Sequence, residues 1–286
     1  MKTLLKQLIR WCKQTIQFIE YLLMLCIKKK AHLPKPTYQG SLAILATGPS
    51  LKSDLPLFEM EEYKSIDKMV MNFFAFDDVF FKLKPKHYCL ADPMYFHHSW
   101  RDEEVFRLFN IFQNKVDWDM NIYVPVSILK EFTTFSQLKN PHLKIWGANT
   151  LAYKGYEKFR MFFYRKGHAM PVPQTVTNFA IFIGLNLGYT EIRLFGVDHT
   201  FLSSLRVNDK NQLCQEFSHY YDEGNIEYKI LYRTEDNEVW KIGDYVTAVG
   251  QMFKSHDLLA DFAKDKGVQI LNYTKESMID SYKRVK

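Results

Sequence analysis

An apolar run that ends in four small residues is the feature that most constrains this chain. The stretch over 42–52 (LAILATGPSLK) begins with apolar residues and then changes to TGPS. A buried strand that turns tightly into a helix has this pattern, and small side chains let a ligand approach the backbone. A second block over 186–201 (NLGYTEIRLFGVDHTF) also predicts a buried strand followed by a polar loop. Two such strand ends in one sheet predict a nucleotide-type cleft at its carboxyl edge.

Segments with strand character alternate with helix-like segments along most of the chain. Strands are expected over 42–46, 69–72, 87–90, 121–126, 191–196 and 268–271, and helices over 102–114, 179–187 and 256–266. This alternation is typical of parallel sheets covered by helices on both faces. The sequence therefore predicts an α/β fold with a single mostly parallel, doubly wound (Rossmann-like) sheet. Its 286 residues, 47% of them hydrophobic, are enough for one large domain with appendages.

Composition divides the chain into three parts. The sequence predicts an amphipathic helix over residues 1–33. It predicts the catalytic domain, which contains the cleft, over residues 38–286. Between about 201 and 250 the sequence becomes polar and charged, with aromatic residues interleaved. We expect this segment to be a lid insertion over the cleft, because a long loop inside a compact domain is usually functional. An exposed β-hairpin without a catalytic role is the alternative for its second half.

The first 30 residues carry the excess positive charge. The chain has a net charge of +6, and this segment contains seven Lys or Arg residues against Glu20 alone. The rest of the chain is electrically neutral, which argues against nucleic acid as a partner. Apolar residues at helical spacing predict a helix that lies on a membrane surface, peripherally, at the cytoplasmic face of the inner membrane. A tilted or signal-anchor span and a helix that binds a partner or caps the core are the alternatives.

Several common motifs of catalysis are missing. The sequence contains no GxGxxG, no GxxxxGK[ST] and no GxSxG, and its four cysteines lie far apart without CxxC spacing. The segment Asp117-Trp118-Asp119 resembles the metal-binding DxD of many nucleotide-sugar transferases, but it precedes a predicted strand, and a solvated turn is the alternative. We therefore expect neither a metal nor a cofactor.

Small and amide-type polar residues remain at the predicted strand ends. Thr47, Asn72 and Asp92 follow the first three strands, from which side chains can reach a nucleotide or a sugar. Thr175 and Thr177 precede a predicted helix, where hydroxyls and free N–H groups suit a carboxylate or phosphate, although plain N-capping also explains them. Further candidates follow the strand over 191–196 or belong to the expected lid: Asp198, His199, Thr200, His219, Tyr220, Tyr221 and Glu223.

The order of five blocks carries a family resemblance. These blocks are GPSL at 48–51, MNFF at 71–74, Asp-Pro at 92–93, LGYxEIxLxGxD at 187–198 and SHY at 218–220. In this order they resemble the bacterial lipooligosaccharide sialyltransferases of glycosyltransferase family forty-two. The related motility-accessory and pterin-pyrophosphokinase-like proteins share much of the same skeleton. The resemblance implies a single nucleotide-binding domain with a lid, and a metal-independent transfer of a sugar from a CMP donor.

The resemblance also implies roles for individual residues of the donor site. Gly48, Pro49 and Ser50 are expected to line the CMP pocket, and Asn72 matches a donor-binding Asn. Thr47 and Asp92 stand where the family has Asn. Thr175 corresponds to a family Thr near the donor carboxylate, and the family Ser after it is Val176 here. Thr177 and Asp198 complete the expected donor site.

The catalytic residues depart from the family pattern. Tyr220 matches a family Tyr near the phosphate of the departing CMP. The family's catalytic base is a His three residues after this Tyr, and this chain has Glu223 at that position. We therefore expect either Glu223 or His219 to take the proton from the acceptor hydroxyl.

These features predict a membrane-associated glycosyltransferase of lipopolysaccharide biosynthesis. Its partners are expected to be a CMP-sugar donor, with a sialic-acid-like sugar as the candidate, and a lipid-linked surface-glycan acceptor. Residues 1–30 are expected to bind the membrane surface. One alternative is a diphosphotransferase of the pterin-pyrophosphokinase type, which would use ATP and Mg²⁺. The other is a non-catalytic scaffold with a sugar-nucleotide fold, which the replacement of the family's base favours.

Overall fold

A central parallel sheet organises the computed structural model, which describes residues 2–27, 31, 33–216, 228–233 and 238–285. Its strands have the order β11-β10-β6-β1-β2-β3-β4-β5, and every pairing between them is parallel. Their bounds are β1 Ser41–Leu45, β2 Asp67–Met71, β3 His87–Cys89, β4 Met120–Pro125, β5 Leu143–Ala148, β6 Glu191–Phe195, β10 Gln269–Asn272 and β11 Lys283–Arg284. The α/β fold class predicted from the sequence is confirmed.

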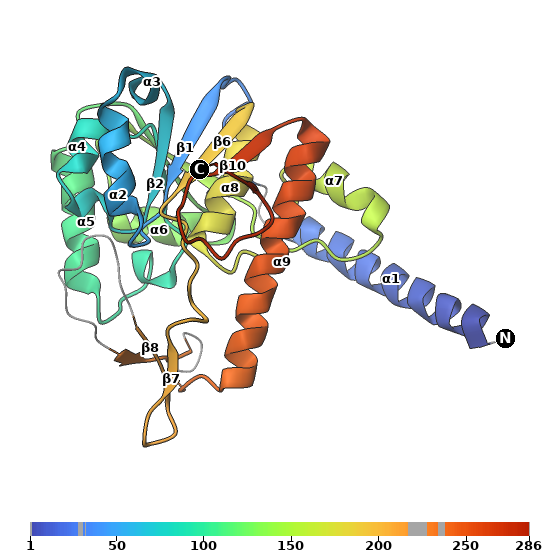
Figure 1. Ribbon diagram of the computed structural model, residues 1–286. Helices are drawn as coiled ribbons and strands as arrows, with labels where there is room; N and C mark the ends of the chain where they lie inside the picture. Colours follow the sequence, from blue (N-terminus) through green and yellow to red (C-terminus); the bar gives the residue numbers. More distant parts are fainter. Residues whose placement is uncertain (1, 28–30, 32, 217–227, 234–237, 286) are drawn as a thin grey trace.

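Helices cover both faces of this sheet (Figure 1). They are α1 Lys2–Ile27, α2 Leu51–Asp54, α3 Glu61–Lys64, α4 Val79–Leu83, α5 Asp102–Asn114, α6 Leu129–Ser136, α7 Glu157–Arg165, α8 Val176–Leu187 and α9 Ile242–Lys266. Short 3-10 helices span Leu55–Glu59, Phe74–Phe76, Pro93–Tyr95 and Val126–Ile128. Buried residues of α7, α8 and α9 pack on one face of the sheet, and those of α4, α5 and α6 pack on the other.

The strands are apolar on both faces, which explains why helices cover both faces of the sheet. In β1, Leu42 and Ile44 belong to the hydrophobic cluster under α8, whereas Ala43 and Leu45 belong to the opposite cluster. Successive side chains of a strand point to opposite faces, so a continuous apolar run must be buried twice. This is the pattern that the sequence shows before each predicted strand end.

Two elements differ from the expectations drawn from the sequence. The edge strand β5 was not predicted, because an edge position leaves four of its six residues at least partly exposed and its sequence lacks a continuous apolar run. Helix α9 begins at Ile242 instead of residue 256, so residues 242–250 of the expected lid form its first turns. Gly243 and Gly250 weaken the helical signal there, because glycine disfavours helix interiors.

The remainder of the expected lid contributes a small antiparallel sheet. It consists of β7 Leu205–Val207, β8 Leu213–Glu216 and β9 Tyr228–Ile230, in the order β7-β8-β9. This sheet lies below the carboxyl ends of the parallel strands in Figure 1, beside the first half of α9.

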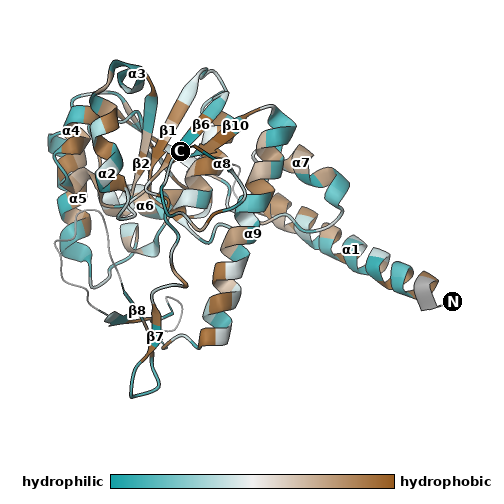
Figure 2. Ribbon diagram, in the orientation of Figure 1, coloured by the Kyte–Doolittle hydropathy of each residue, from teal (hydrophilic) through white to brown (hydrophobic). Residues whose placement is uncertain are grey.

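Helix α1 leaves the body and is anchored only through its second half (Figure 1). Phe18 stacks on Phe159 with ring centroids 5.4 Å apart, and Tyr21 packs edge-on against Tyr153 and Phe163 with centroids 5.0 Å away. The hydropathy colours of Figure 2 show apolar and polar residues alternating along α1. Among the described helices, none is both long enough and apolar enough to cross a membrane.

Candidate functional site

The strand order reverses direction between β1 and β6. From β1 the chain builds the sheet outward through β2, β3, β4 and β5, whereas β6, β10 and β11 extend it on the other side. After its loop, the chain continues from β1 to α2 on one face of the sheet and from β6 toward α9 on the other face. Ligands of open α/β sheets bind in the crevice that forms at such a switch point, at the carboxyl ends of the strands. A cavity of about 620 Å³ lies at this place. Its volume is in the range of small-molecule sites, roughly 300–1,000 Å³.

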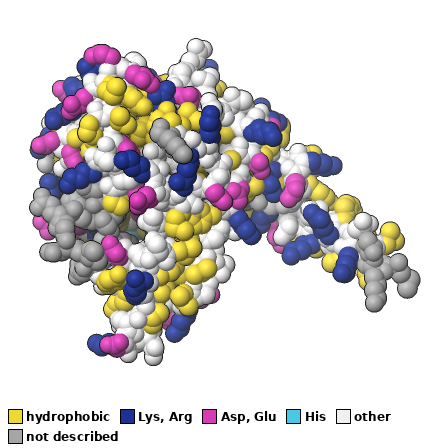
Figure 3. Space-filling view, viewed as in Figure 1, with side chains coloured by type: hydrophobic (Ala, Val, Ile, Leu, Met, Phe, Trp, Pro, Cys, Tyr) yellow, Lys and Arg dark blue, Asp and Glu magenta, His cyan; other side chains and the backbone are white. Residues whose placement is uncertain are grey.

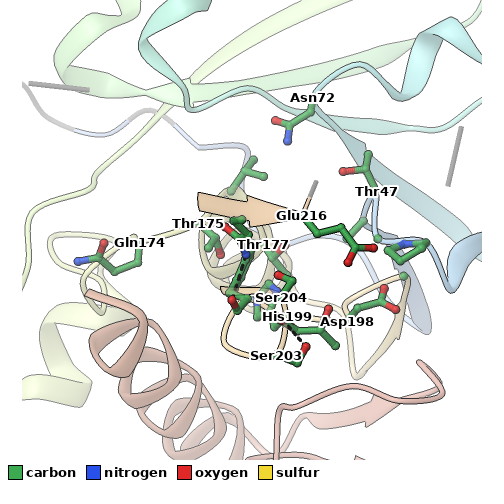
Figure 4. Close-up of a pocket in the computed structure, with 18 of the residues that line it drawn as sticks. Thr47, Asn72, Gln174, Thr175, Thr177, Asp198, His199, Ser203, Ser204 and Glu216 are labelled. Carbon is green, nitrogen blue, oxygen red and sulfur yellow. Dashed lines mark hydrogen bonds between the residues drawn. The ribbon is translucent and has the colours of Figure 1, made fainter. Parts of the chain in front are cut away.

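Ten of the residues singled out in the sequence line this cavity together. They are Thr47, Gly48, Pro49, Asn72, Asp92, Thr175, Thr177, Asp198, His199 and Thr200. Figure 4 labels six of them, with Asn72 and Thr47 above Thr175, Thr177, Asp198 and His199 in this view. Ser50 does not line the cavity but contacts it through Asp198. His219, Tyr220 and Glu223 lie outside the described residues.

Gly48 links the loop after β1 to the loop after β6 and leaves no room for a side chain. Its backbone N–H donates to the carbonyl of Gly196 over 2.9 Å, which joins the loop after β1 to the loop after β6. A Cβ atom on Gly48 would lie 1.9 Å from Oδ2 of Asp198 and 2.5 Å from the carbonyl oxygen of Gly196. Gly48 therefore serves the close packing of two loops, whereas the sequence suggested the close approach of a ligand to the backbone.

Asp198 is a buried carboxylate that clamps the loop after β1. It is 7% exposed and accepts hydrogen bonds from Oγ of Ser50 at 2.8 Å and from the backbone N–H of Ser50 at 3.3 Å. Burial raises the pKa of Asp198, and the two hydrogen bonds from Ser50 oppose this rise. The geometry thus gives Asp198 a role in positioning the small-residue loop.

Asn72 presents an unpaired oxygen at the end of β2. Its Oδ1 atom is buried and has no hydrogen-bond partner among the described residues, and the residue lines the cavity. The hydroxyl of Tyr88 donates to its carbonyl oxygen over 2.5 Å. The backbone of Asn72 is left-handed with φ 54°, a conformation that costs on the order of 1 kcal/mol outside glycine. A buried acceptor without a partner suits a ligand that donates hydrogen bonds.

Asp92 follows β3 and lines the cavity, where its carboxyl group is largely shielded from water. Burial raises the pKa of its carboxyl group, while the charge of Arg101 lowers it. The guanidinium of Arg101 lies over the ring of Phe73 at 4.3 Å, so it is itself held by the loop after β2. Asp92 is therefore a cavity carboxyl that can be protonated more readily than an exposed aspartate.

Helix α8 points its N-terminus at the cavity. Thr175 is its N-cap, because its Oγ1 accepts from the backbone N–H of Asn178 at 3.3 Å. The hydroxyl of Thr177 donates to Sδ of Met71 over 3.7 Å. Plain capping, the alternative considered for these threonines, therefore accounts for Thr175. The free N–H groups of the first turn still make this end of α8 suitable for an anion.

Residues from the small antiparallel sheet and from the turn just before β7 form the other wall, and the sequence did not single them out. They are Ser203, Ser204, Arg206, Gln215, Glu216 and Tyr228. Gln215 is the best anchored of them, since its Nε2 donates to the carbonyl of Phe201 and its Oε1 accepts from the hydroxyl of Tyr245. The sequence around these residues has no apolar run that would predict a strand. Only its polar composition indicated that this segment differs from the rest of the domain.

The segment 117–119 lies at the opposite end of the sheet from the cavity. Asp117 pairs with Lys84 at 2.9 Å and Asp119 lies 3.2 Å from Nδ1 of His142, both just before β4. Within the described residues, no group of three or more His, Cys, Asp or Glu side chains has the arrangement of a metal site. The solvated turn is the reading that these contacts favour for Asp117 and Asp119.

Comparison with protein-family models and with curated proteins finds no match to this sequence. Among solved structures, the fold is similar to that of the MAf glycosyltransferase from Magnetospirillum magneticum AMB-1, with a TM-score of 0.50 and 13% sequence identity. The superposition covers 90% of this chain and 35% of that chain, so this protein spans about a third of its neighbour. At this identity the likeness concerns the fold, and the chain shares its α/β architecture with part of a glycosyltransferase.

Proposed function

We propose that this protein is a glycosyltransferase that moves a sugar from a nucleotide-activated donor to a hydroxyl group of a glycan acceptor. The carrying observation is the convergence of Gly48, Asn72, Thr175 and Asp198 on one cavity at the switch point of the sheet. This is the place where α/β folds of this type bind nucleotides. The fold likeness to part of a known glycosyltransferase supports the same class of reaction.

The proposed donor is a CMP-activated sugar of the sialic-acid type. Its support is the resemblance of the GPSL, MNFF and LGYxEIxLxGxD blocks to the family forty-two enzymes, since residues of all three blocks line the cavity. In this proposal the unpaired Oδ1 of Asn72 accepts a hydrogen bond from the donor. The first turn of α8 holds the sugar carboxylate, and neither a metal nor a cofactor is needed.

The reaction is a substitution at the anomeric carbon of the sugar. The acceptor oxygen forms a bond to this carbon while the bond to the phosphate oxygen breaks, and the electron pair leaves with CMP. The acceptor proton passes to a base of the protein. Arg206 lines the cavity and carries the positive charge that can stabilise the departing phosphate.

Ligand binding tests this proposal before any acceptor is known. We expect CMP to raise the melting temperature without added metal, and UMP, GMP and AMP to raise it less. A panel of CMP-sugars should then show turnover with at least one donor. A shift that requires ATP together with Mg²⁺ would instead support the diphosphotransferase, and binding of CMP without turnover of any donor would support the scaffold.

We also propose that α1 binds the surface of an anionic membrane, where a lipid-linked acceptor would be found. Its outward side exposes large apolar residues, among them Leu4, Leu5, Leu8, Ile9, Trp11, Ile16, Ile19 and Leu23. Lys6, Arg10 and Lys13 are exposed on the same helix, against Glu20. Figure 3 shows these hydrophobic and basic side chains together along α1. An apolar stripe flanked by basic residues is typical of helices that lie in a lipid interface.

Vesicle sedimentation tests this attachment. We expect the 286-residue chain to sediment with vesicles that contain phosphatidylserine and to stay in solution with phosphatidylcholine alone. The pair Leu5→Ser and Ile9→Ser should lower the bound fraction at least tenfold, whereas Gln7→Ser and Gln14→Ser on the polar side should not. Loss of a dimer in these variants, with unchanged lipid binding, would show that a second copy covers the stripe instead.

A further inference from the structure

A pair of buried histidines lies behind the cavity wall. Nε2 of His199, in the loop after β6, lies 3.1 Å from Nε2 of His256 in the middle of α9. Nδ1 of His256 lies 2.9 Å from the hydroxyl oxygen of Tyr282, just before β11. The three side chains are 8%, 0% and 7% exposed, and only His199 lines the cavity. They form a continuous hydrogen-bonded row from the cavity into the core.

The hydrogen bonds of this row leave only two arrangements of protons. Two ring nitrogens in contact share one proton, so one histidine donates and the other accepts. In one arrangement His256 donates from Nδ1 to Tyr282 and accepts at Nε2 from His199. Nδ1 of His199 then carries no proton and is free to accept one. Among the described residues, this nitrogen has no hydrogen-bond partner of its own.

The backbone and the neighbouring rings hold His199 in place. Its φ of 52° is left-handed, a conformation that side chains other than glycine adopt rarely and that clusters at functional sites. The rings of Phe201 and Phe253 lie 5.2 and 6.5 Å from its own ring, measured between centroids. A strained backbone that the surroundings stabilise indicates that the position of this imidazole matters.

We infer that His199 is the base that takes the proton from the acceptor hydroxyl, with His256 and Tyr282 as positioning residues. This inference rests on the proposed glycosyl transfer. The acceptor O–H proton moves to Nδ1 of His199 while the acceptor oxygen bonds to the anomeric carbon and CMP leaves with the electron pair of the broken bond. The added proton is shared between the two imidazoles and returns to solvent after the products leave.

Burial keeps both imidazoles unprotonated before the reaction. Burial lowers the pKa of His199 to about 3 and also lowers that of His256, so both rings are neutral at pH 7, as a base must be before the reaction. A pKa this low also makes a single buried imidazole a weak base, so the inference requires His256, 3.1 Å away, to share the added proton. The charged groups near the row are Asp198, Arg206 and Glu216 on the cavity side, Asp257 beside Tyr282 and Glu276 beside Asp198.

Variants of the row test the inference with a CMP-sugar that the wild type turns over. We expect His199→Ala to lower kcat by about 10²–10⁴-fold, the usual contribution of a general base, with CMP affinity within about threefold. Tyr282→Phe should lower kcat about tenfold and move the acidic limb of the pH–rate profile, with KM unchanged. The matched controls His97→Ala, an exposed histidine outside the cavity, and Tyr164→Phe, a buried tyrosine elsewhere, should leave kcat within twofold.

A second measurement does not depend on variants that fold poorly. In ¹⁵N spectra of histidine-labelled wild-type protein we expect Nδ1 of His199 to be unprotonated and its Nε2 to carry the proton at pH 7. A proton on Nδ1, or full kcat in His199→Ala with loss of kcat in Glu216→Gln, His219→Ala or Glu223→Gln, would overturn the inference and leave the transferase proposal standing. A wild type that turns over no nucleotide sugar would overturn both.

Discussion

The two walls of the cavity are built in different ways. One wall, here called the pocket floor, consists of the ends of β1, β2 and β6 with the start of α8, and its side chains are buried: Thr47, Thr177, Asp198 and His199 are at most 9% exposed. The other wall, the pocket rim, comes from the small antiparallel sheet and includes the exposed Arg206 and Tyr228.

This difference predicts that the two walls contribute differently to the stability of the fold and to ligand binding. Residues of the pocket floor continue the hydrophobic core, so a change in their shape must disturb packing and the ligand site together. Arg206 and Tyr228 of the pocket rim are exposed, so their replacement should change binding without changing stability. The predictions below test this separation.

The largest effect is expected from Gly48→Ala in the pocket floor. The new Cβ would overlap Oδ2 of Asp198 and the carbonyl of Gly196, so we expect a loss of about 1–3 kcal/mol in unfolding free energy, as for other overpacked sites. CMP binding should fall below detection in calorimetry. The matched control is Gly250→Ala in α9, where no atom lies within 4 Å and stability should rise by about 0.5–1 kcal/mol. Unchanged CMP binding in Gly48→Ala would show that CMP does not bind against the pocket floor.

The next effect is expected from Ser50→Ala, which inserts no atom between the packed loops, and it should depend on pH. The change removes the 2.8 Å hydrogen bond to the buried Asp198 carboxylate, which costs about 1–3 kcal/mol of stability at pH 7. Burial already raises the pKa of Asp198 above its value in the unfolded chain, so the charged form weakens the fold at neutral pH. This penalty disappears as the pH falls through the raised pKa.

Urea unfolding at pH 7 and pH 5 measures this dependence. The stability difference between Ser50→Ala and the wild type should be smaller at pH 5, because Asp198 is then more often protonated. Ser65→Ala, an exposed serine after α3 whose hydroxyl contacts no carboxylate among the described residues, should match the wild type at both values. A difference that grows toward acid would show that Ser50 does not act through the Asp198 carboxylate.

The pocket floor could be predicted from the sequence because its residues follow apolar runs. Thr47, Asn72 and Asp198 each come within three residues of the end of a strand whose burial on both faces the sequence shows. Parallel strands bring their carboxyl ends to one edge, so side chains far apart in sequence meet without any further signal. The position of β6 next to β1, which creates the crevice, follows from the topology and not from local sequence.

The pocket rim and the histidine row could not be predicted in the same way. Arg206 and Gln215 belong to strands of three and four residues in a polar segment, where periodicity carries little information. His256 was assigned to a helix but not to the site, because its contact with His199 spans 57 residues. Edge strand β5 could not be predicted for a related reason. Its partial exposure removes the continuous apolar run by which the other strands were predicted.

In the pocket rim, Arg206→Ala should weaken CMP binding without loss of stability. A charge-assisted hydrogen bond contributes about 1.5–3 kcal/mol, which corresponds to a Kd increase of roughly 10–100-fold. Calorimetry at two salt concentrations measures this, and the salt dependence of binding should decrease with the lost charge. Lys210→Ala, an exposed cation of the same hairpin outside the cavity, is the control. A melting temperature several degrees lower for Arg206→Ala would break the separation between floor and rim.

The smallest effect is expected from Tyr228→Phe, which removes one neutral hydroxyl from the pocket rim. Tyr228 is 44% exposed and lines the cavity, and its hydroxyl has no partner among the described residues. A single neutral hydrogen bond to the ligand contributes about 0.5–1.5 kcal/mol, so the Kd should rise roughly two- to tenfold with the melting temperature unchanged. Tyr232→Phe, similarly exposed at 49% but outside the cavity, should bind as the wild type does. Equal binding by all three proteins would move the ligand away from the rim and onto the pocket floor alone.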